Sequence, residues 1–268
     1  TSFYVFDKQA YEDKFSGAGV SFRDEWKWKV NGIYYKITSP SDRVVQVVAN
    51  DKKYSGDVHI PSSILLNNVA YTVSSIDRNA FAGCSLSSIA IPNSLESIGD
   101  SAFYRCNVGK VIIPDIKAWC SMTFGEGFSN PLINSGHLYS DEDIEITELV
   151  IPSGVTSIGS KCFWGCEHLT SVTIPNTVTS IGNDAFRRCD SLSAITIPNS
   201  VTCIGERAFY DCENLISIQF GNGITQIGKD AFAFCWDLKK VIVPDISKWC
   251  SILFGDTDSN PIYHARHL

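Results

Sequence analysis

The stretch GITQIGKD, residues 223–230, has glycines at positions 223 and 228 directly before Lys229. It lacks only the last residue of the phosphate-binding loop G-x-x-x-x-G-K-[ST], in which backbone N–H groups cradle phosphate and a hydroxyl holds magnesium. The residue after Lys229 is Asp230, whose carboxylate repels phosphate. No strand before it or helix after it is predicted, so the sequence does not indicate a nucleotide site here.

A second candidate is CFWGCEH, where Cys162, Cys166 and His168 resemble part of a zinc site. Structural zinc takes four Cys or His ligands, and no second pair at ligand spacing completes this set. The sequence also lacks G-x-S-x-G and H-E-x-x-H motifs, and its five histidines show no common spacing to a serine or cysteine. We therefore predict no metal, no cofactor, no catalytic residue and no enzyme activity.

Composition excludes further classes. The chain has 268 residues, of which 44% are hydrophobic and 19% charged, with a net charge of −7. A large core is possible, whereas a basic surface for nucleic acid or anionic lipid is not expected. No apolar run approaches the roughly 18 residues of a membrane-spanning helix.

The glycines belong to an internal repeat. Three segments begin 23 residues apart: CEHLTSVTIPNTVTSIGNDAF from Cys166, CDSLSAITIPNSVTCIGERAF from Cys189, and CENLISIQFGNGITQIGKDAF from Cys212. The alternation L-x-x-I-x-I predicts a strand with one buried face, and proline ends it. Because 23 residues leave no room for a full helix, each unit is predicted to be a mostly irregular coil with one strand, stable only when stacked as a solenoid.

The shared pattern C-x-x-L-x-x-I-x-I-P-x-x-V-T-x-I-G-x-x-A-F is similar to the leucine-rich repeats of the BspA-like, or Treponema pallidum-type, family of bacterial surface proteins. The resemblance covers roughly residues 55–268 and implies a leucine-rich-repeat solenoid, conventionally classed as α/β. It implies a parallel concave sheet, a convex side that is irregular or carries short 3-10 turns, and adhesion at the cell surface or outside the cell. Because the chain begins at Thr1, we expect that a leader peptide was removed.

Six cysteines occupy one position of successive coils. Stacked strands lie about 4.8 Å apart, so disulfides between neighbouring coils are geometrically possible. A column of inward-pointing thiols that act as small hydrophobes is the favoured interpretation. The six residues are Cys84, Cys106, Cys166, Cys189, Cys212 and Cys235.

An insertion occurs twice. Residues 111–138 align without gaps to residues 241–268, with 15 of 28 positions identical. Asp115 and Asp245 are predicted to cap short helices. The insertion either packs onto the solenoid or carries a protruding loop that recognises a partner. The candidate loop residues are Trp119, Phe124, Phe128, Asn130, Trp249, Phe254 and Asn260. Because the second copy stops at Leu268, we expect an unsealed C-terminal end.

The chain is divided into two parts at the start of the repeat. Residues 1–54 are predicted to be an N-terminal segment with a β-hairpin at Asn31-Gly32, a strand from Val44 and a short helix around Lys8 to Phe15. This segment is expected to cap the solenoid of residues 55–268, whose insertions span about 115–145 and 245–268.

We predict a non-catalytic module that binds protein, from a host, its matrix or other bacteria, with glycan as a further possible ligand. The alternative is a structural spacer that presents another region. If the strands line the concave side, the candidate binding residues lie between its core positions: Ser88, Lys110, Glu148, Ser171, Thr173, Ala194, Thr196, Ser217, Gln219 and Lys240.

Overall fold

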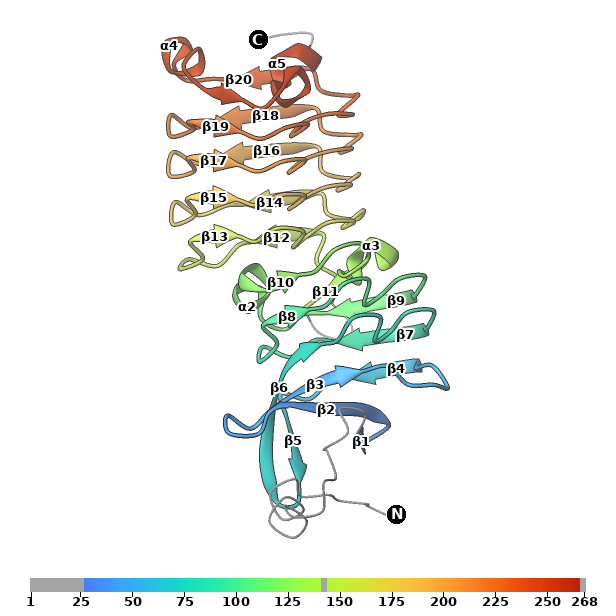
Figure 1. The fold of residues 1–268 in the computed structure, drawn as a ribbon. Coiled ribbons are helices and arrows are strands. Elements are labelled where there is room, and N and C mark those ends of the chain that lie inside the picture. The colour runs from blue at the N-terminus through green and yellow to red at the C-terminus, as the bar shows by residue number, and fades with distance from the viewer. Residues whose placement is uncertain (1–26, 141–143, 266–268) are drawn as a thin grey trace.

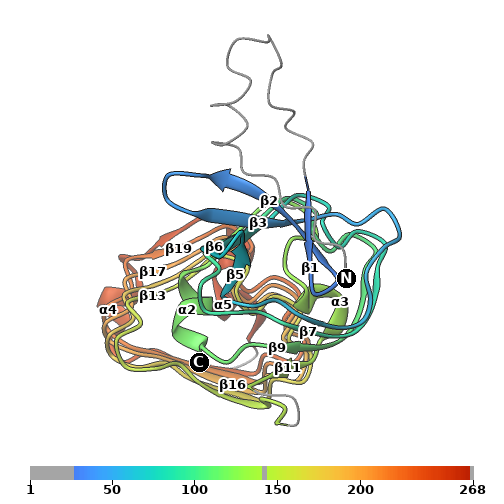
Figure 2. The same ribbon diagram turned by 90° about the horizontal axis from the view of Figure 1, so that it is seen from below.

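A computed structural model describes residues 27–140 and 144–265 of the chain. Short coils stack one on another along a single axis, with the N-terminal strands at one end and helix α5 at the other (Figure 1). Seen along the stack, the coils overlie one another and carry strands on two different sides (Figure 2). The predicted solenoid is confirmed.

The first side carries the strands that the repeat predicts. They pair in parallel as three sheets, in the orders β11-β9-β7-β4, β12-β14 and β16-β18-β20. We call their exposed side the long-strand face. The strands are β4 (Ser55–His59), β7 (Ser85–Ala90), β9 (Asn107–Ile112), β11 (Leu138–Tyr139), β12 (Glu148–Val150), β14 (Ser171–Thr173), β16 (Ala194–Ile197), β18 (Ser217–Phe220) and β20 (Lys240–Ile242).

The second side is more regular than the sequence predicts. Instead of irregular coil it has parallel strands that are mostly two residues long, and the one 3-10 turn among the described residues is Thr257–Ser259. Two residues are too few for an alternating pattern, so only stacking defines these strands. They are β8 (Ser97–Ile98), β10 (Thr123–Phe124), β13 (Ser157–Ile158), β15 (Ser180–Ile181), β17 (Cys203–Ile204), β19 (Gln226–Ile227) and β21 (Leu253–Phe254).

The N-terminal strands continue this second side. β1 (Trp28–Val30) and β2 (Ile33–Ser39) form the predicted hairpin, whose turn residues Asn31 and Gly32 both have positive φ. β3 (Val44–Val48) pairs in parallel with β6 (Val69–Ile76), which pairs in turn with β8. The helix expected around Lys8 to Phe15 lies outside the described residues.

One hairpin was not predicted. β5 (Ser63–Leu66) pairs antiparallel with β6 inside the first coil. Its turn residues Asn67 and Asn68 have φ of 52° and 60°, the left-handed conformation that asparagine tolerates better than most residues. The Asn-Asn pair between alternating segments was the available signal.

A column of phenylalanines forms the centre of the core. Phe163, Phe186, Phe209 and Phe232 are fully buried, and neighbouring rings are stacked with centroids 5.3–5.4 Å apart. In the first coils Phe81 and Phe103 stack in the same way. The hydrophobic residue that each coil cannot bury alone is thus covered by the next coil.

Tyr54 closes this core at the N-terminal end. Its ring lies 4.9 Å from that of Phe81, and its hydroxyl donates to the Val48 carbonyl at 2.6 Å. The same hydroxyl accepts a hydrogen bond from the Tyr34 backbone N–H at 3.0 Å. The N-terminal strands therefore cover the first coil through both apolar and polar contacts.

The last described coil has exposed apolar side chains. Ile246 lies in α4 (Ile246–Trp249), Leu253 in β21 and Tyr263 in α5 (Pro261–His264), and each is about 70% exposed. Residues 266–268, which complete the second insertion, lie outside the described residues.

We expect Phe209→Ala to destabilise the protein by about 3–5 kcal/mol, because it removes a buried ring and leaves a cavity between two stacked neighbours. Urea unfolding followed by circular dichroism measures this. Thr196→Ala, at an exposed strand position, is the control and should change the unfolding midpoint little. Equal midpoints for the two variants would contradict a stabilising role for the stack.

Candidate functional site

The predicted binding residues share one face. All ten lie in the long strands, where each is exposed or half-buried and is followed in sequence by a buried residue. Strand register aligns them across coils: Ser88 pairs with Lys110, Glu148 with Ser171, Ala194 with Ser217 and Ser217 with Lys240. Thr196 pairs with Gln219, and Thr173 lies beside Val150.

The N-terminal third of this face brings charged and aromatic groups close together. Ser88 Oγ donates to Asp57 Oδ1 at 2.7 Å, and Asp57 is aligned with Ser88 in the sheet. The Lys110 ammonium lies 5.1 Å from the centre of the Tyr139 ring, within the range of a cation–π interaction. Asp57 and Tyr139 were not among the predicted binding residues. The strand of Asp57 belongs to the predicted repeat, whereas β11 with Tyr139 follows the insertion and joins the sheet by pairing with β9, which the repeat does not show.

This region is also hollowed. One hollow of about 300 Å³ is lined by Asp57, His59, Ser88 and Lys110. Another of about 440 Å³ adjoins it and reaches the Asn31-Gly32 hairpin turn, and His59 lines both. The hollows therefore lie where the N-terminal hairpin meets the long-strand face.

The distal part of the face is different. Its side chains at Ala194, Thr196 and Ser217 are small and neutral. The exceptions are the charged Glu148 in β12 and Lys240 in β20, and the exposed apolar Val150. Such a surface offers hydrogen-bonding groups over a wide area and little that discriminates between partners.

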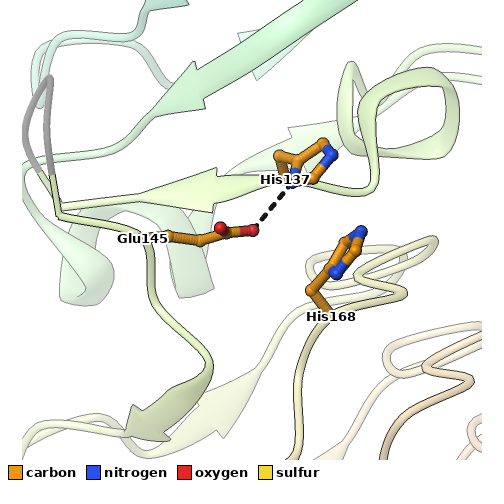
Figure 3. Close-up of side chains that lie close together, drawn as sticks. All are labelled: His137, Glu145 and His168. Atoms are coloured by element: carbon orange, nitrogen blue, oxygen red, sulfur yellow. Dashed lines mark hydrogen bonds and ion pairs between the residues drawn. The ribbon is translucent and has the colours of Figure 1, made fainter.

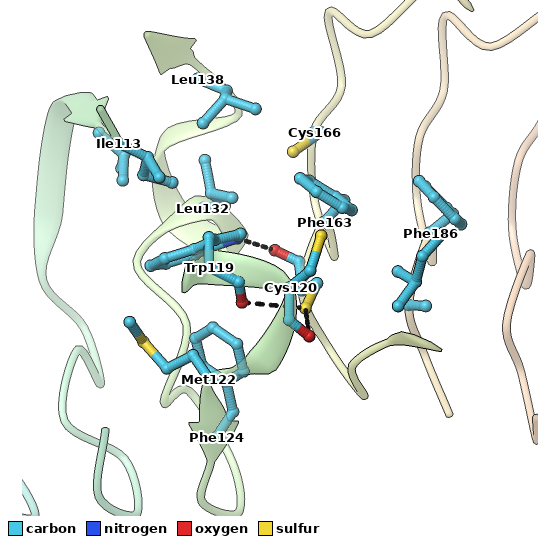
Figure 4. Packing of buried hydrophobic residues seen from close by; sticks show 14 of the residues in the cluster. Ile113, Trp119, Cys120, Met122, Phe124, Leu132, Leu138, Phe163, Cys166 and Phe186 are labelled. Atoms are coloured by element: carbon cyan, nitrogen blue, oxygen red, sulfur yellow. Dashed lines mark hydrogen bonds between the residues drawn. The ribbon is translucent and has the colours of Figure 1, made fainter. Parts of the chain in front are cut away.

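The first insertion is packed into the solenoid. Asp115 caps helix α2 (Ile116–Ser121) by accepting from the Ala118 N–H, as predicted. Trp119 is 1% exposed and Asn130 fully buried, and Phe124 packs against Trp119 with ring centroids 5.0 Å apart (Figure 4). Of the predicted loop residues in this copy, only Phe128 has a substantially exposed side chain, at 40%.

Two polar groups of the insertion bind the next coil. The Trp119 indole N–H donates to the Cys162 carbonyl at 2.7 Å, and the Asn130 amide donates to the carbonyls of Lys161 and Cys162 at 2.6 and 3.0 Å. Ala185 occupies the position of Cys162 in the next coil, where the repeat is regular. There the Ala185 carbonyl accepts from the backbone N–H of Phe163 in the preceding coil. The insertion thus uses side chains to replace backbone donors.

For the buried residues of the first insertion, these contacts fit packing onto the solenoid and not recognition of a partner. Because Trp119 and Asn130 use their donors on the following coil, they are not available to an external partner. Their burial was not evident from the sequence, where Trp119 and the Ser129-Asn130-Pro131 segment (the S-N-P loop) are as compatible with recognition as with packing. For Phe128 the recognition role stays a prediction.

The second insertion repeats the local structure. Asp245 caps α4 by accepting from Ser247 and Lys248, and these hydrogen bonds lower the pKa of its carboxyl. Trp249 is buried against Phe220 and Phe254, with ring centroids 4.9 and 5.5 Å away. Asn260 caps α5 by accepting from the Ile262 N–H, and both Asn260 and Phe254 remain partly exposed.

The cysteine column consists of free, buried thiols. Cys189, Cys212 and Cys235 each donate to the carbonyl of the phenylalanine 26 residues earlier, at 3.1–3.3 Å. Burial raises the pKa of all three thiols, that of Cys235 to about 12. The favoured interpretation of the column, free thiols acting as core residues, is confirmed.

One group of side chains has the composition of a metal site. His137, Glu145 and His168 each offer one ligand atom, and these atoms lie within 4.8 Å of one another. Figure 3 shows that they come from three separate segments. In the sequence, His168 resembles a zinc ligand only together with Cys162 and Cys166, and both of these cysteines are buried in the core.

Together these observations define a leucine-rich-repeat solenoid with a small β cap and an exposed parallel-strand face. The chain belongs to the BspA type leucine rich repeat family, whose model matches residues 61–129 and 133–259 in six copies. The family is one of repeats that generally bind proteins, and no enzyme family is indicated.

Several solved structures are similar to this chain. The Treponema pallidum leucine-rich repeat protein is 20% identical over 90% of this chain and 91% of its own, with a TM-score of 0.48. A leucine-rich cell surface protein from Faecalibacterium prausnitzii is 18% identical over 88% and 99%, with a TM-score of 0.40. The pneumococcal vaccine antigen PcpA is 16% identical over 83% and 71%, with a TM-score of 0.43. Comparison with curated protein sequences found no match.

The described residues include no helix with the length and apolar character needed to cross a membrane.

We expect Asn130→Ala to lower the free energy of unfolding by about 1–3 kcal/mol, because it removes the side-chain amide that donates to the carbonyls of Lys161 and Cys162 and leaves Lys161 only the longer 3.3 Å bond from the Trp164 N–H. Asn260→Ala is the matched control, because the Asn130 and Asn260 side chains both accept from the N–H two residues later, that of Leu132 or Ile262. Among the described residues the Asn260 side chain makes no bond to a further coil. Denaturant unfolding of both variants should show the larger loss for Asn130→Ala. Equal losses would mean that capping alone explains the conserved S-N-P loop of the two copies.

Thiol accessibility should differ between the two insertions. Cys120 is buried, whereas the equivalent Cys250 is exposed. We expect brief iodoacetamide treatment of the native protein at pH 8 to alkylate Cys250 and to leave Cys120, Cys189 and Cys212 unmodified until denaturant is added. Peptide mass spectrometry reads each site. Alkylation of the column in the native state would contradict the packed core.

Proposed function

We propose that this protein is a non-catalytic, protein-binding leucine-rich-repeat module that acts at the bacterial cell surface or after secretion. Its binding surface is the long-strand face, centred on the hollowed N-terminal third. Host proteins, matrix proteins or other bacteria are the proposed partners, and adhesion is the proposed biological role.

The observation that carries the proposal is that the hollow on the exposed sheet is lined by charged and polar side chains. Asp57, His59, Ser88 and Lys110 surround the same depression, beside the aromatic ring of Tyr139. A cation, a carboxylate and an aromatic ring within one concave patch can pair with complementary groups of a protein partner. Surface location is proposed from membership of the family alone.

The alternative function is a spacer that holds another region away from the cell. The small, neutral side chains of the distal face favour it, since they give no strong anchor. Deleting the first insertion would not separate the two functions, because its Trp119 and Asn130 hold the following coil. Substitutions confined to the exposed face are therefore the sharper test.

We expect Lys110→Glu to weaken binding to a partner identified among host extracellular proteins by about tenfold or more, because it reverses a charge at the edge of the hollow. Lys117→Glu is the control and should bind like the wild type, since Lys117 is an exposed lysine of helix α2 and lies outside the long strands. Surface plasmon resonance with the purified partner measures both variants, and circular dichroism verifies folding. Equal affinities for wild type and Lys110→Glu would show that the hollow is not part of the binding surface. Failure to find any specific partner would favour the spacer function.

A further inference from the structure

We propose that His137, Glu145 and His168 form a zinc site that joins the first insertion to the coil that follows it. The group shares no residue with the lining of the hollows, although it is close to one of them: the His137 carbonyl accepts from the N–H of Val111, the neighbour of Lys110, at 3.1 Å. The zinc site does not depend on the proposed binding function. Its ligands come from three segments that the chain brings together only at this junction (Figure 3).

The backbone holds two of the ligands side by side. His137 directly precedes β11, and Glu145 returns along that strand through an antiparallel bridge to Tyr139. The Ile146 N–H donates to the Leu138 carbonyl at 2.7 Å, which fixes the return. As a result His137 Nδ1 lies 2.8 Å from Glu145 Oε1.

The third ligand comes from the first coil after the insertion. His168 lies between buried Cys166 and buried Leu169, and the Leu169 N–H donates to the Cys166 carbonyl at 3.1 Å. Its ring stacks on that of His137 with centroids 4.2 Å apart and planes 16° from parallel. The His168 backbone is thus fixed while its side chain is exposed to solvent.

The repeat itself does not require a histidine here. The positions equivalent to His168 in the following coils are Ser191, Asn214 and Asp237. A histidine therefore occurs at the coil that faces His137 and Glu145, and the three coils beyond it have other residues. The neighbouring Glu167 is paired with Arg188 at 3.2 Å, so the carboxylate available to the group is that of Glu145.

Two imidazoles and one carboxylate are a ligand set that zinc takes in proteins, with a fourth position left for water. Around tetrahedral zinc with bonds of about 2.0–2.1 Å, ligand atoms lie about 3.4 Å apart. The present separations run from 2.8 Å, between His137 and Glu145, to at most 4.8 Å, so each differs from this value by no more than about 1.4 Å. His168 is exposed, so its ring is free to turn about its side-chain bonds to shorten these separations while the backbone stays in place.

The test is a calorimetric titration of the full chain, freed of metal by a chelator, with zinc chloride. We expect one zinc per chain and a rise in the unfolding temperature, because zinc that binds the folded state stabilises it. His168→Ala and Glu145→Gln should each weaken binding by about tenfold or more, since two ligands remain where three were present. His264→Ala, which removes a histidine of α5, should leave binding unchanged.

Ten cysteines could also attract zinc, and cobalt distinguishes the two kinds of ligand. Cobalt bound by the proposed site should show visible d–d bands without the strong near-ultraviolet absorption of a cobalt–thiolate bond. A chain that takes up no zinc, a thiolate spectrum, or unchanged affinity in His168→Ala would each overturn the proposal. His168 is exposed, so its substitution should leave the fold intact, and circular dichroism verifies this.

Discussion

Every coil of this protein depends on the hydrogen bonds and ring contacts that it exchanges with the coils on either side. At one turn the glycine N–H donates to an isoleucine carbonyl of the preceding coil, as Gly182, Gly205 and Gly228 do to Ile158, Ile181 and Ile204 at 2.8 Å. These turns also pack tightly against the turn of the preceding coil: a Cβ on Gly205 would lie 2.5–2.6 Å from atoms of Asn183 and Gly182. A larger residue would separate the coils, which explains the recurring I-G step of the repeat.

The same constraint gives the insertion its role. A coil that follows an interruption has backbone carbonyls with no regular partner, and burying them unpaired is costly. Trp119 and Asn130 supply donors from their side chains, while the Cys120 carbonyl accepts from the Gly159 N–H at 2.9 Å in place of a strand residue. The first insertion thus connects the coils before it to the coils after it. This connection places His137 and Glu145 beside His168.

Much of the fold could be predicted from local pattern. The long strands, the Asn31-Gly32 hairpin, the helix caps at Asp115 and Asp245 and the thiol column were all predicted, because each follows from a short period, a turn dipeptide or a recurring position. The two-residue strands were missed because Ser180–Ile181 is too short to show a period. The Asn67-Asn68 hairpin was missed because it interrupts the repeat in its first coil. The exposed face was predicted from strand alternation, but its hollow was not, since Asp57, Ser88 and Lys110 come together only where β4, β7 and β9 lie side by side.

By itself, the sequence determined the coil, its strand register and the residues that point inward, because a 23-residue repeat forces every unit to bury the same positions. It also explained GITQIGKD, whose Gly228 is the turn glycine of its coil and not part of a phosphate loop. The tertiary structure decided what happens where the repeat is broken. Trp119 and Asn130 act on residues more than 30 positions away, and His137, Glu145 and His168 meet through a junction that has no period. Contacts of that kind depend on how two stacks are joined, and no local pattern in the sequence encodes them.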